Sequence, residues 1–109
     1  MEMKESIVTT RSISGKIIRL TYRQWYHIIE SHDYMAGNLE KIVETIALPD
    51  CIAHGVAGEF LAMKHYARTN ITTKTCVVAY RENGDGFIIT SFFTSEPERI
   101  RKRGLVWQT

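Results

Sequence analysis

The spacing of apolar residues changes halfway along the chain, and this change constrains the fold more than any other feature. In the first half, apolar residues recur at the spacing of a helix face, at positions 22, 25, 26 and 29 and again at positions 39, 42, 43 and 46. The second half is rich in β-branched and aromatic residues in three segments, 58–67, 74–82 and 86–95. The pattern therefore predicts helices first and strands afterwards.

Local signals mark where the two helices begin and end. Thr21 with Gln24 three residues later is typical of a capping box, and the helix that follows is expected to end near His32 or Asp33. Asn38 is a good N-cap for the second helix, and Pro49 ends it.

Turn residues between the later segments predict how the strands pair. The sequence NGDG at 83–86 is a strong hairpin signal, GKIIRL at 15–20 is a short strand candidate, and LVWQ at 105–108 is a candidate edge strand. Because hairpins pair strands antiparallel, the expected fold is α+β, with two N-terminal helices packed on an antiparallel sheet of about four strands. Residues 1–14 are expected to be a polar lead-in, and residues 15–109 a single domain.

Composition restricts the class of protein. The chain has 109 residues, of which 44% are hydrophobic and 24% charged, as in a soluble one-domain protein. No apolar run has the length of a membrane span, and the polar start lacks the apolar centre of a signal peptide. Cys51 and Cys76 match no metal or redox spacing, so we expect a cytoplasmic protein without metal or cofactor.

Two histidines lie five residues apart in the first predicted helix. Five residues turn a helix so that His27 and His32 point roughly 140° apart, whereas a helical metal pair is spaced by four. His32 continues the apolar stripe towards the sheet, and His27 falls on the opposite side. His32 is therefore the better candidate for a functional role; the alternative is a histidine at the edge of the core, bonded to a backbone carbonyl.

Strand alternation suggests a polar face but leaves its membership open. One interpretation gathers Lys64, Tyr66, Thr90 and Thr94 on a single face of the sheet. In the other, Thr90 is simply a good strand former and Lys64 protects an edge strand from aggregation. The register of the strands decides between them.

Charge adds one local feature. The net charge is only +2, but the segment from Arg99 to Arg103 holds four cations in five residues. It is either a solvated terminal turn or a phosphate-binding cluster.

The order of these motifs resembles a known superfamily of ribonucleases. The motifs run TYRQWYHIIESHDY, LEKIVETIALPDCI, EFLAMKHY, TCVVAYRE, GFIITSFFT and RKRGLVW. They are similar to the phage and polymorphic-toxin branch of the barnase–EndoU–colicin–RelE (BECR) superfamily, whose domains carry a histidine-bearing helix, a second helix ending in a proline–aspartate turn, and antiparallel strands. The chain departs from that pattern at Asp33, where a proline often follows the second histidine, and at Phe92, where a tyrosine is typical.

The resemblance implies metal-independent cleavage of RNA by attack of a ribose 2′-hydroxyl on the adjacent phosphate. It implies His32 as a proton-transfer residue, Lys64 and Arg81 as phosphate ligands, and Thr90 as an orienting donor. His27, Tyr66 and Thr94 are secondary candidates. The cations Arg99, Arg101, Lys102 and Arg103 would hold the RNA backbone.

The expected partners are RNA, either tRNA or mRNA, and a cognate antitoxin or immunity protein. Two alternatives stay open: a catalytically silent relative that binds RNA or a protein partner, and a small-molecule binder. No glycine-rich phosphate loop supports the latter.

Overall fold

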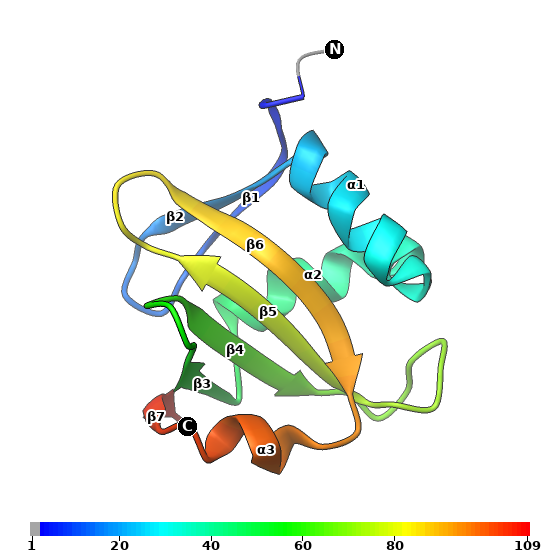
Figure 1. Ribbon diagram of the computed structural model, residues 1–109, viewed down its shortest axis with the longest axis vertical. Helices are drawn as coiled ribbons and strands as arrows, with labels where there is room; N and C mark the ends of the chain where they lie inside the picture. The colour runs from blue at the N-terminus through cyan, green and yellow to red at the C-terminus, as the bar shows by residue number, and fades with distance from the viewer. Residues whose placement is uncertain (1–2) are drawn as a thin grey trace.

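A computed structural model, which describes residues 3–109, shows one mixed β-sheet with helices around it (Figure 1). The strands are β1 (Ser6–Arg11), β2 (Ile17–Thr21), β3 (Cys51–His54), β4 (Phe60–His65), β5 (Thr75–Arg81), β6 (Gly86–Thr94) and β7 (Leu105–Gln108). The helices are α1 (Tyr22–Ser31), the 3-10 helix η1 (Asp33–Gly37), α2 (Leu39–Ala47) and α3 (Pro97–Arg101). The predicted α+β class is therefore confirmed.

The sheet is larger than predicted and is not purely antiparallel. Its strand order is β1-β2-β6-β5-β4-β3-β7, which makes seven strands where about four were expected. All neighbours pair antiparallel except β2 and β6, which run parallel and pair Ile18 with Gly86 and Arg19 with Phe87. Hairpin turns signal only pairing between strands that are close in sequence, so this contact across most of the chain had no local signal.

Gly86 allows the parallel pair to form. A Cβ atom at this position would overlap the Ile17 carbonyl and the Ile18 side chain. Only a residue without a side chain lets β2 approach β6 this closely.

The predicted lead-in also contributes to the sheet. Ser6–Arg11, inside the segment expected to be a polar lead-in, forms the edge strand β1 and pairs with β2. Its half-buried Ile7 and Val8 pack against the core, so burial on one side is enough to order a largely polar strand. The rest of the predicted lead-in includes residues 1 and 2, which lie outside the described residues.

Helix α1 lies along the part of β6 that β2 leaves unpaired, as Figure 1 shows. The Thr21 hydroxyl accepts a hydrogen bond from the Gln24 backbone N–H at 3.2 Å, which confirms the predicted N-cap. The Gln24 side chain does not complete the capping box and instead donates to the Ile89 carbonyl on β6 at 2.6 Å. The helix ends at Ser31 with His32 as its C-cap, as predicted.

Helix α2 covers one face of the sheet, behind the strands in Figure 1. Asn38 stands at its N-cap position, but its side chain donates to the Tyr34 carbonyl and to Asn70 rather than to the helix. The face beneath α2 forms the main core, built from Ile18, Leu20, Trp25, Ile28, Met35, Ile42, Ile46, Ile52, Ala62, Cys76, Val78, Tyr80, Ile88 and Phe93.

The C-terminal part contains a short helix and the predicted edge strand. LVWQ forms β7, as expected, and pairs with β3. The cationic segment overlaps α3 instead of a simple turn, because Ile100 is buried against Cys51, Ala53, Leu61 and Met63 on the face opposite α2. None of the helices within residues 3–109 has the length and apolar character needed to span a membrane.

Candidate functional site

The side of the sheet opposite α2 is only partly covered, and we call it the open face. Strand register places these side chains on it: Arg19 of β2, Phe87, Thr90, Phe92 and Thr94 of β6, Thr75, Val77, Ala79 and Arg81 of β5, and Leu61, Met63 and His65 of β4. Helix α3 packs over the β3–β4 side, where Leu61 and Met63 are buried. The β5–β6 side keeps half-buried aromatic, hydroxyl and cationic groups, which makes it the best candidate for binding.

The long strand β6 carries the centre of the open face, and its free edge is held by side chains. Gln24 of α1 donates to the Ile89 carbonyl, and the Tyr34 hydroxyl accepts a hydrogen bond from the Phe93 N–H at 3.1 Å. The Tyr34 ring stacks on the Phe93 ring, with centroids 5.4 Å apart. These contacts satisfy part of the unpaired backbone and fix the position of Phe92 between them.

His32 lies at the point where α1 meets β6. Its ring centroid is 5.6 Å from that of Phe92 on the open face and 5.9 Å from that of Tyr34. The side chain is half-buried, so it is positioned by packing and still reaches solvent. His32 therefore stands at the rim of the open face, on the side of α1 that faces the sheet.

His27 is exposed on α1, away from the buried Trp25 and Ile28. The separation of His27 from His32 that helical phase predicts is therefore confirmed. They do not form one cluster.

The two predicted threonines lie on the open face near His32. Thr90 pairs with Ala79 and stands one side-chain position from Phe92 along the same face. Thr94 stands one position beyond Phe92 and pairs with Thr75, which pairs in turn with His65. Residues Thr75, Thr94 and His65, with the neighbouring Lys74, line a depression of about 320 Å³ at this end of the sheet.

Arg81 lies at the opposite end of the open face. It pairs with Phe87, whose other neighbour is Arg19 on β2, so two arginines stand on either side of one phenylalanine in the sheet, and the Arg81 guanidinium lies near Gly58 of the β3–β4 loop. The Nε atom of Arg19 is buried without a hydrogen-bond partner among residues 3–109. Arg81 thus does not join His32 and Thr94, which lie towards the other end of β6.

Lys64 and Tyr66 do not share a face with Thr90 and Thr94, so that interpretation of the alternation is wrong. Lys64 pairs with Cys76 on the face beneath α2 and donates to the Leu48 carbonyl at 2.9 Å. The register of β4 against β5 decides this, since Lys64 stands opposite Cys76 rather than opposite Thr75.

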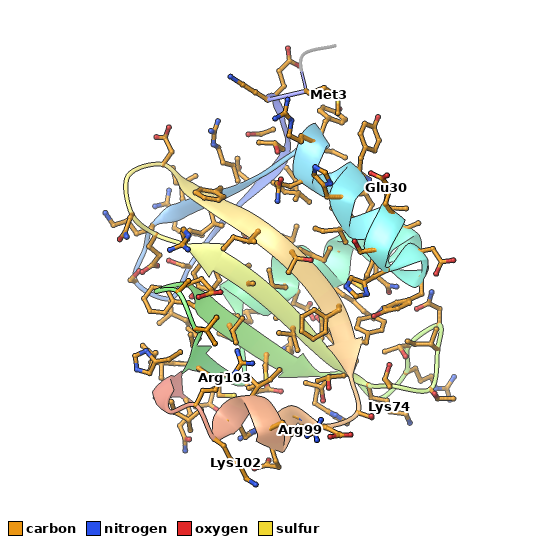
Figure 2. All side chains as sticks on the ribbon, viewed as in Figure 1. Met3, Glu30, Lys74, Arg99, Lys102 and Arg103 are labelled. Carbon is orange, nitrogen blue, oxygen red and sulfur yellow. The ribbon has the colours of Figure 1, made fainter. Side chains whose placement is uncertain are left out.

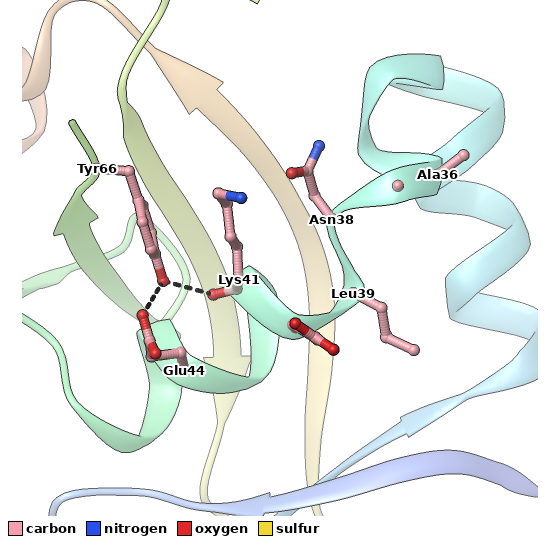
Figure 3. A pocket seen from close by; sticks show the side chains of 8 residues that line it. Ala36, Asn38, Leu39, Lys41, Glu44 and Tyr66 are labelled. Carbon is pink, nitrogen blue, oxygen red and sulfur yellow. Dashed lines mark hydrogen bonds between the residues drawn. The ribbon is translucent and has the colours of Figure 1, made fainter. Parts of the chain in front are cut away.

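Tyr66 belongs to a depression of about 570 Å³ beside α2 (Figure 3). Its hydroxyl is 2.7 Å from the Glu44 carboxylate and donates to it, and the ammonium of Lys41 lies 5.4 Å from the centre of its ring. Burial raises the pKa of Tyr66, and the hydrogen bond to Glu44 raises it further. Tyr66 is therefore a structural contact of α2 and not a proton donor on the open face.

Among residues 3–109, two cations of the cluster form ion pairs and two do not. Arg99 pairs with Glu96 at 2.8 Å, and Arg101 with Glu98 at 3.3 Å. Lys102 and Arg103 follow the helix and are exposed. Figure 2 shows Arg99, Lys102, Arg103 and Lys74 gathered at the end of the molecule where α3 lies.

Several residues of the open face were missed by sequence reasoning. Arg19, Phe87 and Thr75 join it only through strand pairing, and Tyr34 joins His32 through η1. The one available signal was alternation: Arg19 stands between the apolar residues Ile18 and Leu20, and so had to face the other way.

The open face can bind a planar, anionic chain. Its rings offer surfaces for stacking, its arginines offer charge, and its threonines offer hydrogen bonds. Among residues 3–109, no three histidine, cysteine or carboxylate side chains form a cluster that could hold a metal ion.

Comparisons with family models, with curated proteins and with solved structures give no match for this chain.

Proposed function

We propose that the protein is an endoribonuclease that binds a single-stranded segment of RNA on the open face. The observation that carries the proposal is the position of His32, packed on Phe92 at the rim of a face that also holds Thr90, Arg19 and Arg81. A proton-transfer group thus stands beside a surface suited to bases and phosphates.

The aromatic side chains supply the binding platform. Phe87 and Phe92 are half-buried on the same face of β6, so part of each side chain is accessible to a base. Stacking of a base on an aromatic ring contributes roughly 1–3 kcal/mol. Arg19 and Arg81 beside Phe87 would hold the phosphates of the same strand.

Cleavage of RNA by this route requires two proton transfers. The ribose 2′-hydroxyl attacks the adjacent phosphorus, the bond from phosphorus to the 5′-oxygen breaks, and a cyclic phosphate and a 5′-hydroxyl result. One group removes the 2′-hydroxyl proton and another protonates the departing oxygen. His32 suits either transfer because a histidine exchanges protons near neutral pH.

Binding without cleavage is the second candidate function. The described rings around His32 are those of Tyr34 and Phe92, and Lys64, expected to be a phosphate ligand, faces α2 instead. Among residues 3–109, the rings paired with that of His32 are therefore those of a tyrosine and a phenylalanine, and neither is a second histidine. This favours a module that holds RNA but leaves it intact.

Cleavage assays with matched histidine variants test the proposal. Single-stranded RNA is incubated with wild type, His32→Ala and His27→Ala in EDTA, and melting temperatures are measured on the same preparations. We expect His32→Ala to lower the cleavage rate by about 10²–10⁴-fold. His27→Ala, which changes an exposed histidine on the same helix, should cleave like wild type.

The outcomes separate the candidates. If wild type leaves RNA intact across neutral pH but binds it, the binding module replaces the enzyme. If His32→Ala cleaves as fast as wild type while both remain folded, His32 has no part in the reaction. His32→Gln, which keeps a polar side chain at the contact with Phe92, distinguishes lost chemistry from lost packing.

A further inference from the structure

A third depression lies on the side of the sheet opposite the open face. It has a volume of about 200 Å³ and lies between the turn joining β1 to β2 and the strands β3, β4, β5 and β7. Its walls are mostly apolar and include the rings of Phe60, Tyr80 and Trp107, with Ile13 and Val106 at the surface. None of the residues proposed to bind RNA lines it.

The hydroxyl of Tyr80 gives this pocket a polar group. Tyr80 is 2% exposed, and its ring packs on Phe60 with centroids 5.6 Å apart. Its hydroxyl makes no hydrogen bond with any described residue, whereas the Tyr34 and Tyr66 hydroxyls both do. Because no described side chain or backbone group occupies this hydroxyl, it is available to a molecule that enters the pocket.

Glu82 follows the end of β5, two residues after Tyr80, and also lines the pocket. Its carboxylate accepts hydrogen bonds from the Ser12 and Ser14 hydroxyls, which tie the β1–β2 turn to the pocket wall. Burial raises the pKa of Tyr80, and the charge of Glu82 raises it further. The Tyr80 hydroxyl carries a proton at neutral pH, as tyrosines do, and can donate it in a hydrogen bond.

We propose that this pocket binds a small planar aromatic molecule whose hydrogen-bond acceptor faces the Tyr80 hydroxyl. Three aromatic rings among the walls favour a flat, apolar ligand. The size favours one or two fused rings, since pockets for drug-sized molecules have roughly 300–1,000 Å³. The donor requires an acceptor such as a ring nitrogen or a carbonyl oxygen.

Quinoline, a two-ring molecule with one acceptor nitrogen, is a suitable probe. It is titrated into ¹⁵N-labelled protein, and the indole N–H signal of Trp107 is followed by NMR after assignment with Trp107→Phe. We expect saturable shifts at Trp107 and the other pocket residues, with a dissociation constant on the order of 1 mM or tighter. Tyr80→Phe, which keeps the ring, should weaken binding by about fivefold through loss of one hydrogen bond.

Val106 and Leu105 are neighbours on β7, and one serves as the test position and the other as its control. Val106 is 44% exposed and lines the pocket, whereas Leu105 is 39% exposed and does not line it. Val106→Trp should fill the mouth and abolish binding, and Leu105→Trp should leave it unchanged. The proposal is overturned if Trp107 does not respond to quinoline up to its solubility limit. Equal affinity in Tyr80→Phe or in Val106→Trp would overturn it as well.

Discussion

The two faces of the sheet differ in how completely they are buried. On the side covered by α2, Ile18 of β2, Ile28 of α1 and Ile42 of α2 are 0% exposed and belong to one continuous core. On the open face, Phe87, Thr90 and Phe92 are only half-buried, although they lie on the same strand as buried core residues. The covered face is specified by apolar packing, and the open face keeps groups whose contribution to folding is small.

Mutations on the two faces of the sheet are therefore expected to change different properties of the protein. A change on the covered face is expected to act on the free energy of unfolding, whereas under the proposed function a change on the open face acts on the binding of RNA.

Two isoleucines test the comparison most directly. Ile42→Ala should lower the free energy of unfolding by about 2–5 kcal/mol, because it leaves a cavity in a closed core. Ile17→Ala, at an isoleucine that is 56% exposed, should cost less than about 1 kcal/mol. Urea denaturation of both variants measures the two values, and equal losses would contradict the distinction between the faces.

Gly86→Ala should destabilise the contact between β2 and β6. The added methyl group would overlap the Ile17 carbonyl, so we expect a loss of about 1–3 kcal/mol in the free energy of unfolding. Gly37→Ala is the control, because a Cβ there meets nothing within 4 Å. Thermal melting of both proteins shows whether the close approach of β2 matters.

Phe92→Ala should act on RNA more than Tyr26→Ala does. Loss of a stacking surface on the open face should weaken binding of single-stranded RNA by roughly 1–3 kcal/mol. Tyr26 is 43% exposed on α1, and its ring packs near that of Tyr22 rather than on the open face. Fluorescence anisotropy with labelled RNA compares them, and matching affinities would remove Phe92 from the interface.

The smallest expected effect is that of a single unpaired cation near α3. If Arg103 contacts a phosphate, Arg103→Ala should make the slope of log affinity against log salt less steep by about 0.7. Lys41→Ala on α2, which covers the other face, should leave the slope unchanged. A salt series of RNA-binding measurements is sufficient, and identical slopes in all three proteins would exclude the contact.

Much of the local structure could be predicted from sequence. Thr21 caps α1, His32 ends it, NGDG separates β5 from β6, and LVWQ forms β7. Each depends on a few neighbouring residues. The separation of His27 from His32 also follows from helical phase alone.

The open face itself could not be predicted, because register joins residues that are distant in the chain. Alternation showed that Lys64 and Tyr66 share a face and that Thr90 and Thr94 share a face, but not whether these two faces are the same. A shift of one residue in the pairing of β4 with β5 would have moved Lys64 to the other side.

The sequence by itself determined α1 and α2, the N-cap of α1, the hairpin and the α+β class, since turn chemistry and apolar spacing act within a few residues. The tertiary structure alone decided the parallel pairing of β2 with β6, which brings Arg19 beside Phe87 and Arg81. It also decided that His32 meets Phe92 at the rim of the open face, while Lys64 turns towards α2. These contacts depend on which surfaces can be buried together over the whole chain, and no short segment carries that information.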